Sequence, residues 1–244
     1  WKEKESRKPL ILNGARQVGK TYILREFGRN EYKRMAFFSL DRDQKALEIF
    51  NKGGRATDML MALSAICHED ITPHDTLVVL DEIQNCPKAL EALKFFCEET
   101  PGIDIVVAGS LLGLSIHSGV SYPVGKVEEL HLYPMTFLEF LEAMGKTQLV
   151  NLLENKNWTV INMLETELIS SLRQYYYVGG MPAAVLAHNK KKGWKEVRRI
   201  QQQIITDYRR DFSKHAPTRE IPRINMVWDS IPAQLAKENK KFVY

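Results

Sequence analysis

Short apolar runs alternate with helical patterns through the first half of the chain. The apolar runs that predict strands cover residues 9–12, 34–39, 76–80, 103–108 and 127–132. Helical patterns lie between them, at residues 19–27, 43–67 (broken by Gly53 and Gly54) and 87–99. Continuous apolar strands that alternate with helices are typical of a parallel sheet covered on both faces. We therefore predict an α/β domain of three layers over residues 1–133.

The pattern is helical from residue 134 onward. The stretches that predict helices cover residues 135–144, 147–155, 160–177, 182–189 and 194–212. They predict a helical lid over residues 134–216. Prolines punctuate the rest of the chain, and a short helix over residues 231–237 is expected to begin at Pro232. We expect residues 217–244 to be the start of a C-terminal domain that is truncated here.

An eight-residue motif from Gly14 to Thr21 joins the first predicted strand to the first predicted helix. It matches the phosphate-binding P-loop at every fixed position. Its glycines let successive backbone N–H groups point at phosphate oxygens, Lys20 supplies a mobile positive charge, and the Thr21 hydroxyl is a ligand for Mg²⁺. We expect these residues to bind the nucleotide: Gly14, Ala15, Arg16, Gln17, Val18, Gly19, Lys20, Thr21 and Tyr22.

Two acidic residues end the third predicted strand. A buried strand that ends in Asp81 and Glu82 places both at the carboxyl edge of the sheet, beside the P-loop. We expect Asp81 to bind nucleotide-associated Mg²⁺ together with Thr21, and Glu82 to orient or deprotonate the attacking water. Ser110 ends the next strand and is a candidate sensor of the γ-phosphate, although a strand-to-loop turn also explains it. The predicted catalytic residues are therefore Lys20, Glu82 and Ser110.

Composition limits the class of protein. With 44% hydrophobic and 26% charged residues, the chain has the balance of a globular protein, and no apolar run approaches the roughly 20 residues of a transmembrane helix. The N-terminus lacks the apolar segment of a signal peptide. Three irregularly spaced cysteines favour a reducing compartment, most simply the cytoplasm. Residues 67–70 (Cys-His-Glu-Asp) are better explained as a helix end than as a metal site.

Positive charge is concentrated in the last third of the chain. The net charge is +4, and residues 188–215 alone hold nine Lys or Arg against three Asp or Glu. Such a stretch can meet an anionic partner such as nucleic acid, although a solvated basic helix face is the simpler explanation. The sequence pattern is silent on oligomeric state.

Together the motifs resemble one family. The chain is similar to AAA-type ATP-binding proteins of bacteria and archaea, in which an AAA-like domain is followed by a C-terminal domain of unknown function. The chain departs from that family at residues 125–126, where Gly-Lys replaces the expected Gly-Arg and keeps the cation. The stretches that carry the resemblance are Lys8 to Thr21, Leu80 to Gln84, Ala108 to Ser110, Leu132 to Leu141, Gly179 to Pro182 and Ile231 to Ala236.

This resemblance implies a P-loop NTPase sheet of the additional-strand type, with strand order 5-1-4-3-2, a helical lid and a C-terminal domain that is winged-helix-like or nuclease-like. Residues 180–182 (Gly-Met-Pro) are similar to the lid element of signal-transducing P-loop ATPases, whose backbone packs on the adenine. Pro182 is therefore a predicted nucleotide contact, although a helix end followed by a helix start explains the same residues. Arg173, Arg209 and Arg210 are candidate arginine fingers, and surface positions explain them equally well.

These motifs support two functions. The first is an AAA-type ATPase that binds Mg²⁺ and ATP and uses hydrolysis to drive or gate a conformational change. The second is a nucleotide switch with little turnover, in which ATP or ADP sets the lid and recruits DNA or a protein partner. A small-molecule kinase is less well supported, because no acidic pair beyond Asp81 and Glu82 is placed to activate an acceptor hydroxyl unless residues 41–58 hide one.

Overall fold

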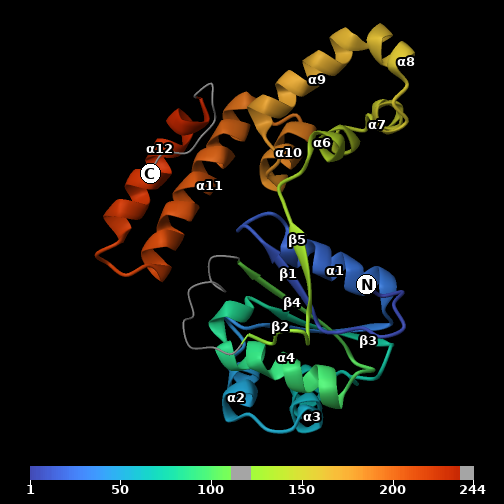
Figure 1. Cartoon of the computed structure of the whole chain (residues 1–244), viewed down its shortest axis with the longest axis vertical. Coiled ribbons are helices and arrows are strands. Elements are labelled where there is room, and N and C mark those ends of the chain that lie inside the picture. The colour runs from blue at the N-terminus through green and yellow to red at the C-terminus, as the bar shows by residue number, and fades with distance from the viewer. Residues whose placement is uncertain (111–121, 237–244) are drawn as a thin grey trace. The chain divides into compact units, whose positions relative to one another are not determined.

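The structure, a computed structural model, describes residues 1–110 and 122–236, apart from the side chains of residues 213–215. The chain forms two compact units, Trp1–Pro134 and Met135–Tyr244. Figure 1 shows a sheet with helices in the first unit and helices in the second.

A parallel sheet forms the centre of the first unit. Its order is β2-β3-β4-β1-β5, and every neighbouring pair of strands is parallel, which confirms the predicted order 5-1-4-3-2. The first strand is longer than predicted, because Asn13 pairs with Gly109 on one side and with His131 on the other. The strands are β1 (Leu10–Gly14), β2 (Arg34–Ser39), β3 (Thr76–Asp81), β4 (Asp104–Ser110) and β5 (Glu128–Leu132).

Helices cover both faces of this sheet, with α1 on one face and α2, α3 and α4 on the other (Figure 1). Side chains of a strand point to alternate faces, so Leu77 and Val79 of β3 pack with Leu24 of α1, while Val78 and Leu80 pack in the core on the other face. These four residues of β3 are at most 1% exposed, as a central strand covered on both faces requires. The elements are α1 (Lys20–Glu31), α2 (Gln44–Lys52), α3 (Ala56–Cys67), the 3₁₀ helix η1 (Ile83–Asn85) and α4 (Pro87–Glu99).

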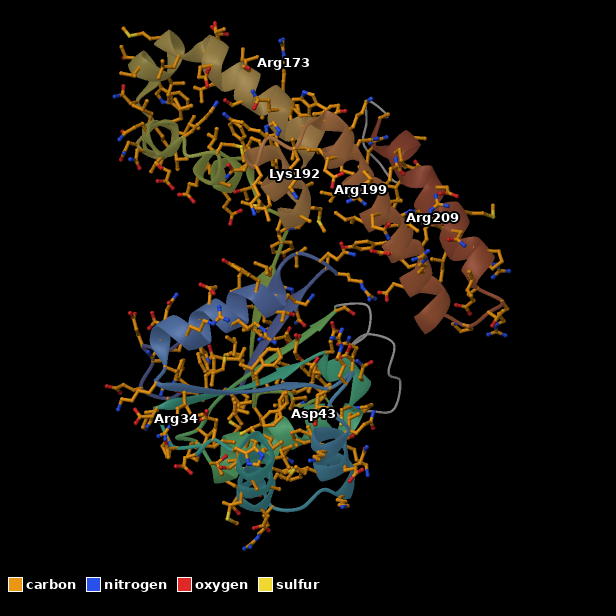
Figure 2. The ribbon with its side chains drawn as sticks, turned by 180° about the vertical axis from the view of Figure 1, so that it is seen from behind. Arg34, Asp43, Arg173, Lys192, Arg199 and Arg209 are labelled. Atoms are coloured by element: carbon orange, nitrogen blue, oxygen red, sulfur yellow. The ribbon has the colours of Figure 1, made fainter. Side chains whose placement is uncertain are left out.

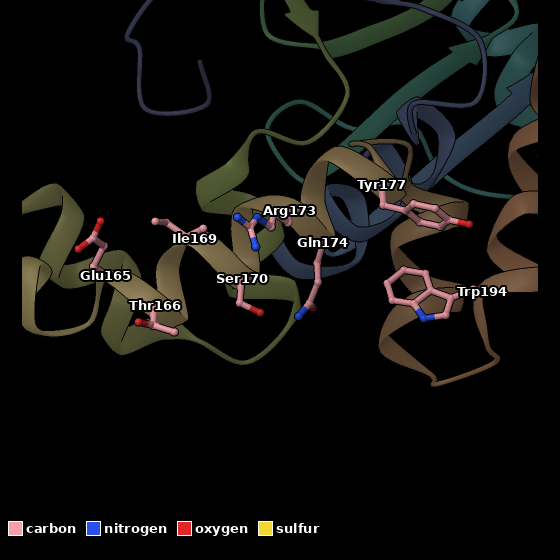
Figure 3. Close-up of a pocket in the computed structure, with 8 residues that line it drawn as sticks. All are labelled: Glu165, Thr166, Ile169, Ser170, Arg173, Gln174, Tyr177 and Trp194. Carbon is pink, nitrogen blue, oxygen red and sulfur yellow. The ribbon is translucent and has the colours of Figure 1, made fainter.

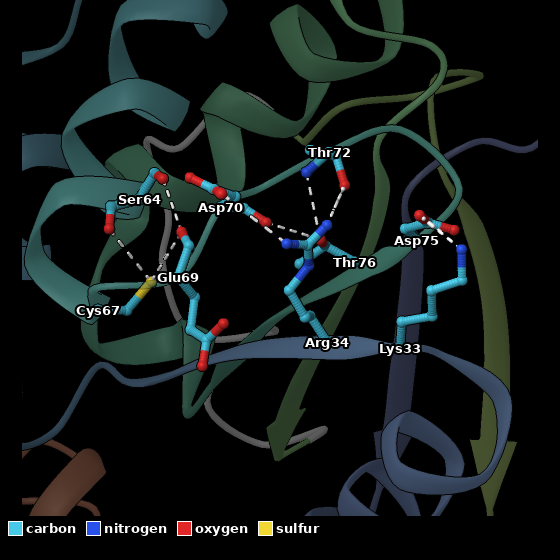
Figure 4. A network of polar contacts seen from close by, with 9 residues as sticks. All are labelled: Lys33, Arg34, Ser64, Cys67, Glu69, Asp70, Thr72, Asp75 and Thr76. Carbon is cyan, nitrogen blue, oxygen red and sulfur yellow. Dashed lines mark hydrogen bonds and ion pairs between the residues drawn. The ribbon is translucent and has the colours of Figure 1, made fainter.

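A polar network holds the N-terminal ends of β2 and β3 (Figure 4). Arg34 donates to Thr72 Oγ1 at 3.1 Å and lies 3.8 Å from the Asp70 carboxylate, and Thr76 Oγ1 donates to the Asp70 carbonyl at 2.9 Å. The Asp70 carboxylate thus forms an ion pair with Arg34. His68 ends α3 in a left-handed conformation with φ of 58°. The prediction that residues 67–70 are a helix end is therefore confirmed. Over residues 1–110 and 122–236, no group of three or more His, Cys, Asp or Glu is placed to hold a metal ion.

Helices build the second unit over the residues that the structure describes. Its core packs Phe140, Val178, Val185 and Val197, all at most 2% exposed. None of the helices in the described chain is both long and apolar enough to cross a membrane. The helices are α6 (Phe137–Ala143), α7 (Thr147–Glu154), α8 (Trp158–Met163), α9 (Glu165–Val178), α10 (Pro182–Asn189), α11 (Trp194–His215) and α12 (Ile221–Leu235).

Two predicted helices of this unit were wrong in their bounds. The helix expected at residues 160–177 is two helices, α8 and α9, which meet at Leu164. The short helix expected to begin at Pro232 is the end of α12, which begins eleven residues earlier at Ile221. Pro222 occupies the first turn of α12, where a missing N–H costs nothing, whereas Pro232 lies inside the helix. A separate domain over residues 217–244 stays a prediction.

Two of the motif stretches meet in the second unit, at Met135 and Gly180. The Met135 N–H donates to the Gly180 carbonyl at 2.7 Å, and the Met135 carbonyl accepts from Tyr175 Oη at 2.8 Å. Thr136 then caps α6 through reciprocal hydrogen bonds with Glu139. A Cβ at Gly180 would lie 2.2 Å from the Met135 carbonyl oxygen, so only glycine fits this close approach.

Gly180→Ala is therefore expected to lower the free energy of unfolding by about 1–3 kcal/mol, because the added methyl forces these two backbones apart. The urea midpoint, followed by circular dichroism, measures the change. Gly102→Ala is the control: Gly102, like Gly180, lies outside the left-handed region, and its added Cβ would meet only side-chain atoms, with Pro73 Cβ at 3.3 Å. A loss no larger than that of the control would contradict the tight contact.

Candidate nucleotide site

The carboxyl ends of β1, β3 and β4 lie at one edge of the sheet. In the register of the strands, Gly14 at the end of β1 stands opposite Ser110 of β4 and Leu132 of β5. Asp81 ends β3, the neighbour of β4 on the other side. The topology therefore places the P-loop, Asp81 and Ser110 at the same edge, where open α/β sheets bind ligands.

The P-loop makes a tight turn between β1 and α1. Gln17 and Gly19 both have positive φ, 64° and 98°, so the backbone curls before the helix begins. Val18 is 3% exposed and anchors the turn from inside. A Cβ at Gly14 would lie 2.5 Å from the Leu132 carbonyl oxygen, so a side chain is excluded where the loop leaves the sheet.

Lys20 folds back over this loop. Its Nζ donates to the carbonyl oxygens of Gly14 at 3.0 Å and Ala15 at 2.9 Å. Burial lowers the pKa of Lys20, and the negative charges of Glu82 and Asp81 oppose that shift. The ammonium thus lies on the loop and is partly desolvated. From there its N–H groups can donate to phosphate oxygens in place of the loop carbonyls.

Thr21 and Asp81 join the two sequence motifs into one site. Thr21 Oγ1 donates to Asp81 Oδ2 at 2.7 Å, and Asp81 Oδ1 accepts from the backbone N–H of Glu82 at 3.0 Å. Asp81 is 5% exposed, so its carboxylate oxygens accept hydrogen bonds from these donors rather than from bulk water. A hydroxyl and a carboxylate side by side are oxygen ligands of the kind that Mg²⁺ prefers, so the residues fit that ion.

Glu82 follows directly in an unusual backbone conformation. Its φ is 57°, in the left-handed region that non-glycine residues rarely adopt, and such strain is common at functional sites. Its carboxylate accepts a hydrogen bond from Gln84 Nε2, and Gln84 is 8% exposed. Gln84 is not among the predicted site residues, although it ends the Leu80–Gln84 stretch that carries the family resemblance.

A groove of about 760 Å³ adjoins Thr21, Asp81 and Glu82. The sequence pattern does not predict this groove, although one signal points to it: β2 ends at the same edge of the sheet, and two acids come soon after it. Figure 2 marks one of them, Asp43, which caps α2 by accepting from the Ala46 N–H at 3.1 Å. The groove is also lined by Arg25, Phe37, Ser39, Asp41, Arg42, Asp43, Gln44 and Lys45.

Asp41 and Asp43, the two acids that follow β2, form hydrogen bonds with residues close to them in the sequence. Ser39 Oγ donates to Asp41 at 2.5 Å, and this hydrogen bond lowers the pKa of Asp41. Arg42 Nε lies 3.3 Å from the other Asp41 oxygen. Residues 41–58 therefore do contain acids beside the site, but the carboxylates of Asp41 and Asp43 already bind neighbouring residues of the chain.

The remaining predicted residues of the first unit are spread along the loop and the sheet. Ala15 is half-buried, and Arg16 and Tyr22 are exposed, the ring of Tyr22 by 70%. Lys126, which stands where the family has arginine, precedes β5 and so lies at the opposite edge of the sheet, 3.0 Å from Glu98. The nucleotide contacts of Ala15, Arg16 and Tyr22 stay predictions, and the chain that follows Ser110 lies outside the described residues up to residue 121.

Four predicted residues belong to the second unit. Pro182 is the first residue of α10, and Arg173 lies on α9. Arg209 and Arg210 form ion pairs within their own unit, with Asp229 and Asp207. Roles of these residues at the nucleotide stay predictions.

Comparison with known proteins agrees with this architecture. A family model described as an AAA domain matches residues 6–141, and a model described as a domain of unknown function (DUF8612) matches residues 169–244. Among curated proteins, no sequence matches the chain. The AAA match followed by a domain of unknown function confirms the order of domains that the resemblance implied.

Three solved structures are similar in part, and the chain spans less than two thirds of the length of each. They are Drosophila ORC bound to DNA (16% identity, 83% of this chain and 63% of that chain, TM-score 0.48), a variant of Thermotoga maritima RuvB (19%, 57% and 42%, 0.36) and C. elegans PCH-2 (12%, 59% and 40%, 0.33). Similarity at this level does not indicate an activity. Because the AAA model covers more than half of the residues, the chain belongs to the AAA domain family.

Proposed function

We propose that this chain binds Mg²⁺ and ATP at the P-loop, hydrolyses the nucleotide, and uses hydrolysis to drive or gate a conformational change. Membership of the AAA domain family supports nucleotide binding and ATPase activity. The observation that carries the proposal is the 2.7 Å hydrogen bond between Thr21 and Asp81. It brings a P-loop hydroxyl and a strand-end carboxylate into one site beside Lys20 and Glu82.

Each residue has a distinct part in this proposal. When bound, Mg²⁺ neutralises charge on the phosphates. Thr21 and Asp81 would hold the ion, and Lys20 would move its N–H donors from the loop carbonyls to phosphate oxygens. Glu82 orients the attacking water or accepts its proton, and Ser110, opposite Gly14 in the sheet, offers a hydroxyl toward the terminal phosphate.

Thr21→Val tests the proposed Mg²⁺ site, because valine keeps the shape of threonine and removes the hydroxyl. We expect phosphate release at saturating ATP to fall about 10- to 100-fold, the effect of losing one contact to a charged group. Thr21→Ser retains the hydroxyl and is expected to retain most activity. Steady-state phosphate release over a series of Mg²⁺ concentrations measures both. Equal release from the valine and serine variants would exclude a ligand role for Thr21.

One observation favours a second function. The Glu82 carboxylate accepts a hydrogen bond from Gln84, and an oxygen held in this way is less available to take a proton from water. This supports a nucleotide switch with little turnover, whose bound nucleotide controls the recruitment of DNA or a protein partner. Tight ATP binding without phosphate release above background, even with DNA present and at high protein concentration, would favour the switch over the ATPase.

A further inference from the structure

One face of α9 forms a groove within the second unit (Figure 3). Its volume is about 820 Å³, which is large enough for a small organic group such as a nucleotide base. The lining comes from one side of α9 and from the first residue of α11. These residues are Glu165, Thr166, Ile169, Ser170, Arg173, Gln174, Tyr177 and Trp194.

Two aromatic rings stand together at one end of this groove. The rings of Tyr177 and Trp194 lie 4.8 Å apart, edge to face at 80° (Figure 3). Gln201 of α11 fixes this arrangement, because its Nε2 donates to the carbonyls of Tyr177 at 2.7 Å and Val178 at 3.0 Å. The His188 ring supports Trp194 from another side at 4.9 Å. Even so, Tyr177 is 51% exposed and Trp194 is 48% exposed.

Positive charge surrounds these rings. The turn between α10 and α11 carries three consecutive lysines, two more cations follow on α11, and Arg173 lies in the groove itself. Figure 2 labels Arg173 and Lys192 among them. Glu196, the acid within this stretch, is paired with Arg199. Within the chain that the structure describes, none of these six cations forms an ion pair: Arg173, Lys190, Lys191, Lys192, Lys195 and Arg198.

Exposed aromatic rings and nearby cations that form no ion pair are the two elements that bind single strands of nucleic acid. Cations alone would suit any anionic surface, and a solvated helix face needs no aromatic pair. A duplex keeps its bases stacked on one another, so it would leave Tyr177 and Trp194 unused. An apolar helix is a poor occupant as well, because Glu165, Thr166 and Ser170 make the far end of the groove polar.

We propose that this surface, made of Tyr177, Trp194 and the six cations, binds single-stranded nucleic acid. An unstacked base enters the groove and stacks on the Trp194 ring, the nearly perpendicular Tyr177 ring contacts the edge of the base, and the cations contact the neighbouring phosphates. The proposal does not depend on the nucleotide site of the first unit. Its failure would leave the proposed ATPase intact, and the reverse also holds.

The stacking part is tested with the full chain and a dye-labelled oligothymidylate, by fluorescence anisotropy at low salt. Trp194→Ala is expected to weaken binding about tenfold, the usual effect of removing one stacked aromatic ring. Trp158→Ala is the matched control, because Trp158 is 62% exposed on α8 and lies outside the proposed surface. We expect the control to bind as the unchanged protein does. Equal affinity of the two variants would overturn the stacking role.

The charge part is tested by replacing two exposed lysines, Lys192→Gln together with Lys195→Gln, which leaves the packed side chains in place. The plot of log affinity against log salt is expected to become less steep by about 1.4, because each phosphate contact to a single strand contributes about 0.7. Lys52→Gln, an exposed lysine of the first unit, is the control and is expected to keep the slope. An unchanged slope in the double variant would overturn the proposed phosphate contacts.

A duplex of the same length separates the competing occupants. Tighter binding to the single strand than to the duplex supports the proposal. Equal or tighter binding to the duplex would overturn it in favour of a groove-binding mode. No binding to either at low salt would also overturn it, and would leave this surface to an acidic protein partner.

Discussion

Lys20→Ala is expected to weaken nucleotide binding at least about 100-fold. Lys20 makes two hydrogen bonds to loop carbonyls, and the same donors are the ones that would meet phosphate oxygens. Each hydrogen bond to a charged group contributes about 1.5–3 kcal/mol, so the loss of two gives an effect of this size or more. Equilibrium titration with a fluorescent ATP analogue in the presence of Mg²⁺ measures it.

The control for this variant is Lys52→Ala, which removes an exposed lysine at the end of α2. It is expected to bind the analogue as the unchanged protein does, with the same circular dichroism spectrum. If Lys20→Ala also bound with full affinity, the phosphates would have to lie away from this loop, and both proposed functions would fail together.

Glu82→Gln is expected to reduce hydrolysis about 10²- to 10⁴-fold and to leave ATP binding within about threefold. The amide has nearly the size of the carboxylate but cannot accept a proton from water. Binding persists because the phosphates are held by the loop, Lys20 and the Thr21–Asp81 pair. Single-turnover phosphate release together with the binding titration separates the two effects.

The matched control is Glu48→Gln on the exposed side of α2. Full hydrolysis in Glu82→Gln would remove Glu82 from the chemistry and leave another residue as the base. Tight binding with no turnover even before the substitution would instead favour the switch, in which Gln84 keeps the Glu82 carboxylate occupied.

Local rules predict which residues gather at the carboxyl edge of the sheet. The P-loop is a contiguous motif that needs only a strand before it and a helix after it, and β1 and α1 supply both. The position of Asp81 is equally predictable, because the apolar run of β3 ends there. The strand order was implied by the family resemblance and is confirmed, although nothing in the apolar runs themselves distinguishes one order of parallel strands from another.

Features that depend on distant contacts were not predictable. The Met135–Gly180 contact joins residues 45 positions apart, and only the folded second unit shows that Gly180 is needed for close approach. The start of α12 was missed because Pro222 reads as a break in the sequence, whereas it opens the helix. The groove beside Glu82 arises where the β2–α2 turn meets β3, and no single window of sequence contains both.

The contact between Gly14 and Leu132 has a mechanical consequence. The first residue of the phosphate loop rests against the last residue of the edge strand β5, so closely that no side chain fits between them. Strand pairing and this close contact together join the loop to the end of β5. A displacement of the chain at Leu132 is therefore expected to reach the phosphate loop through backbone atoms rather than through a side chain.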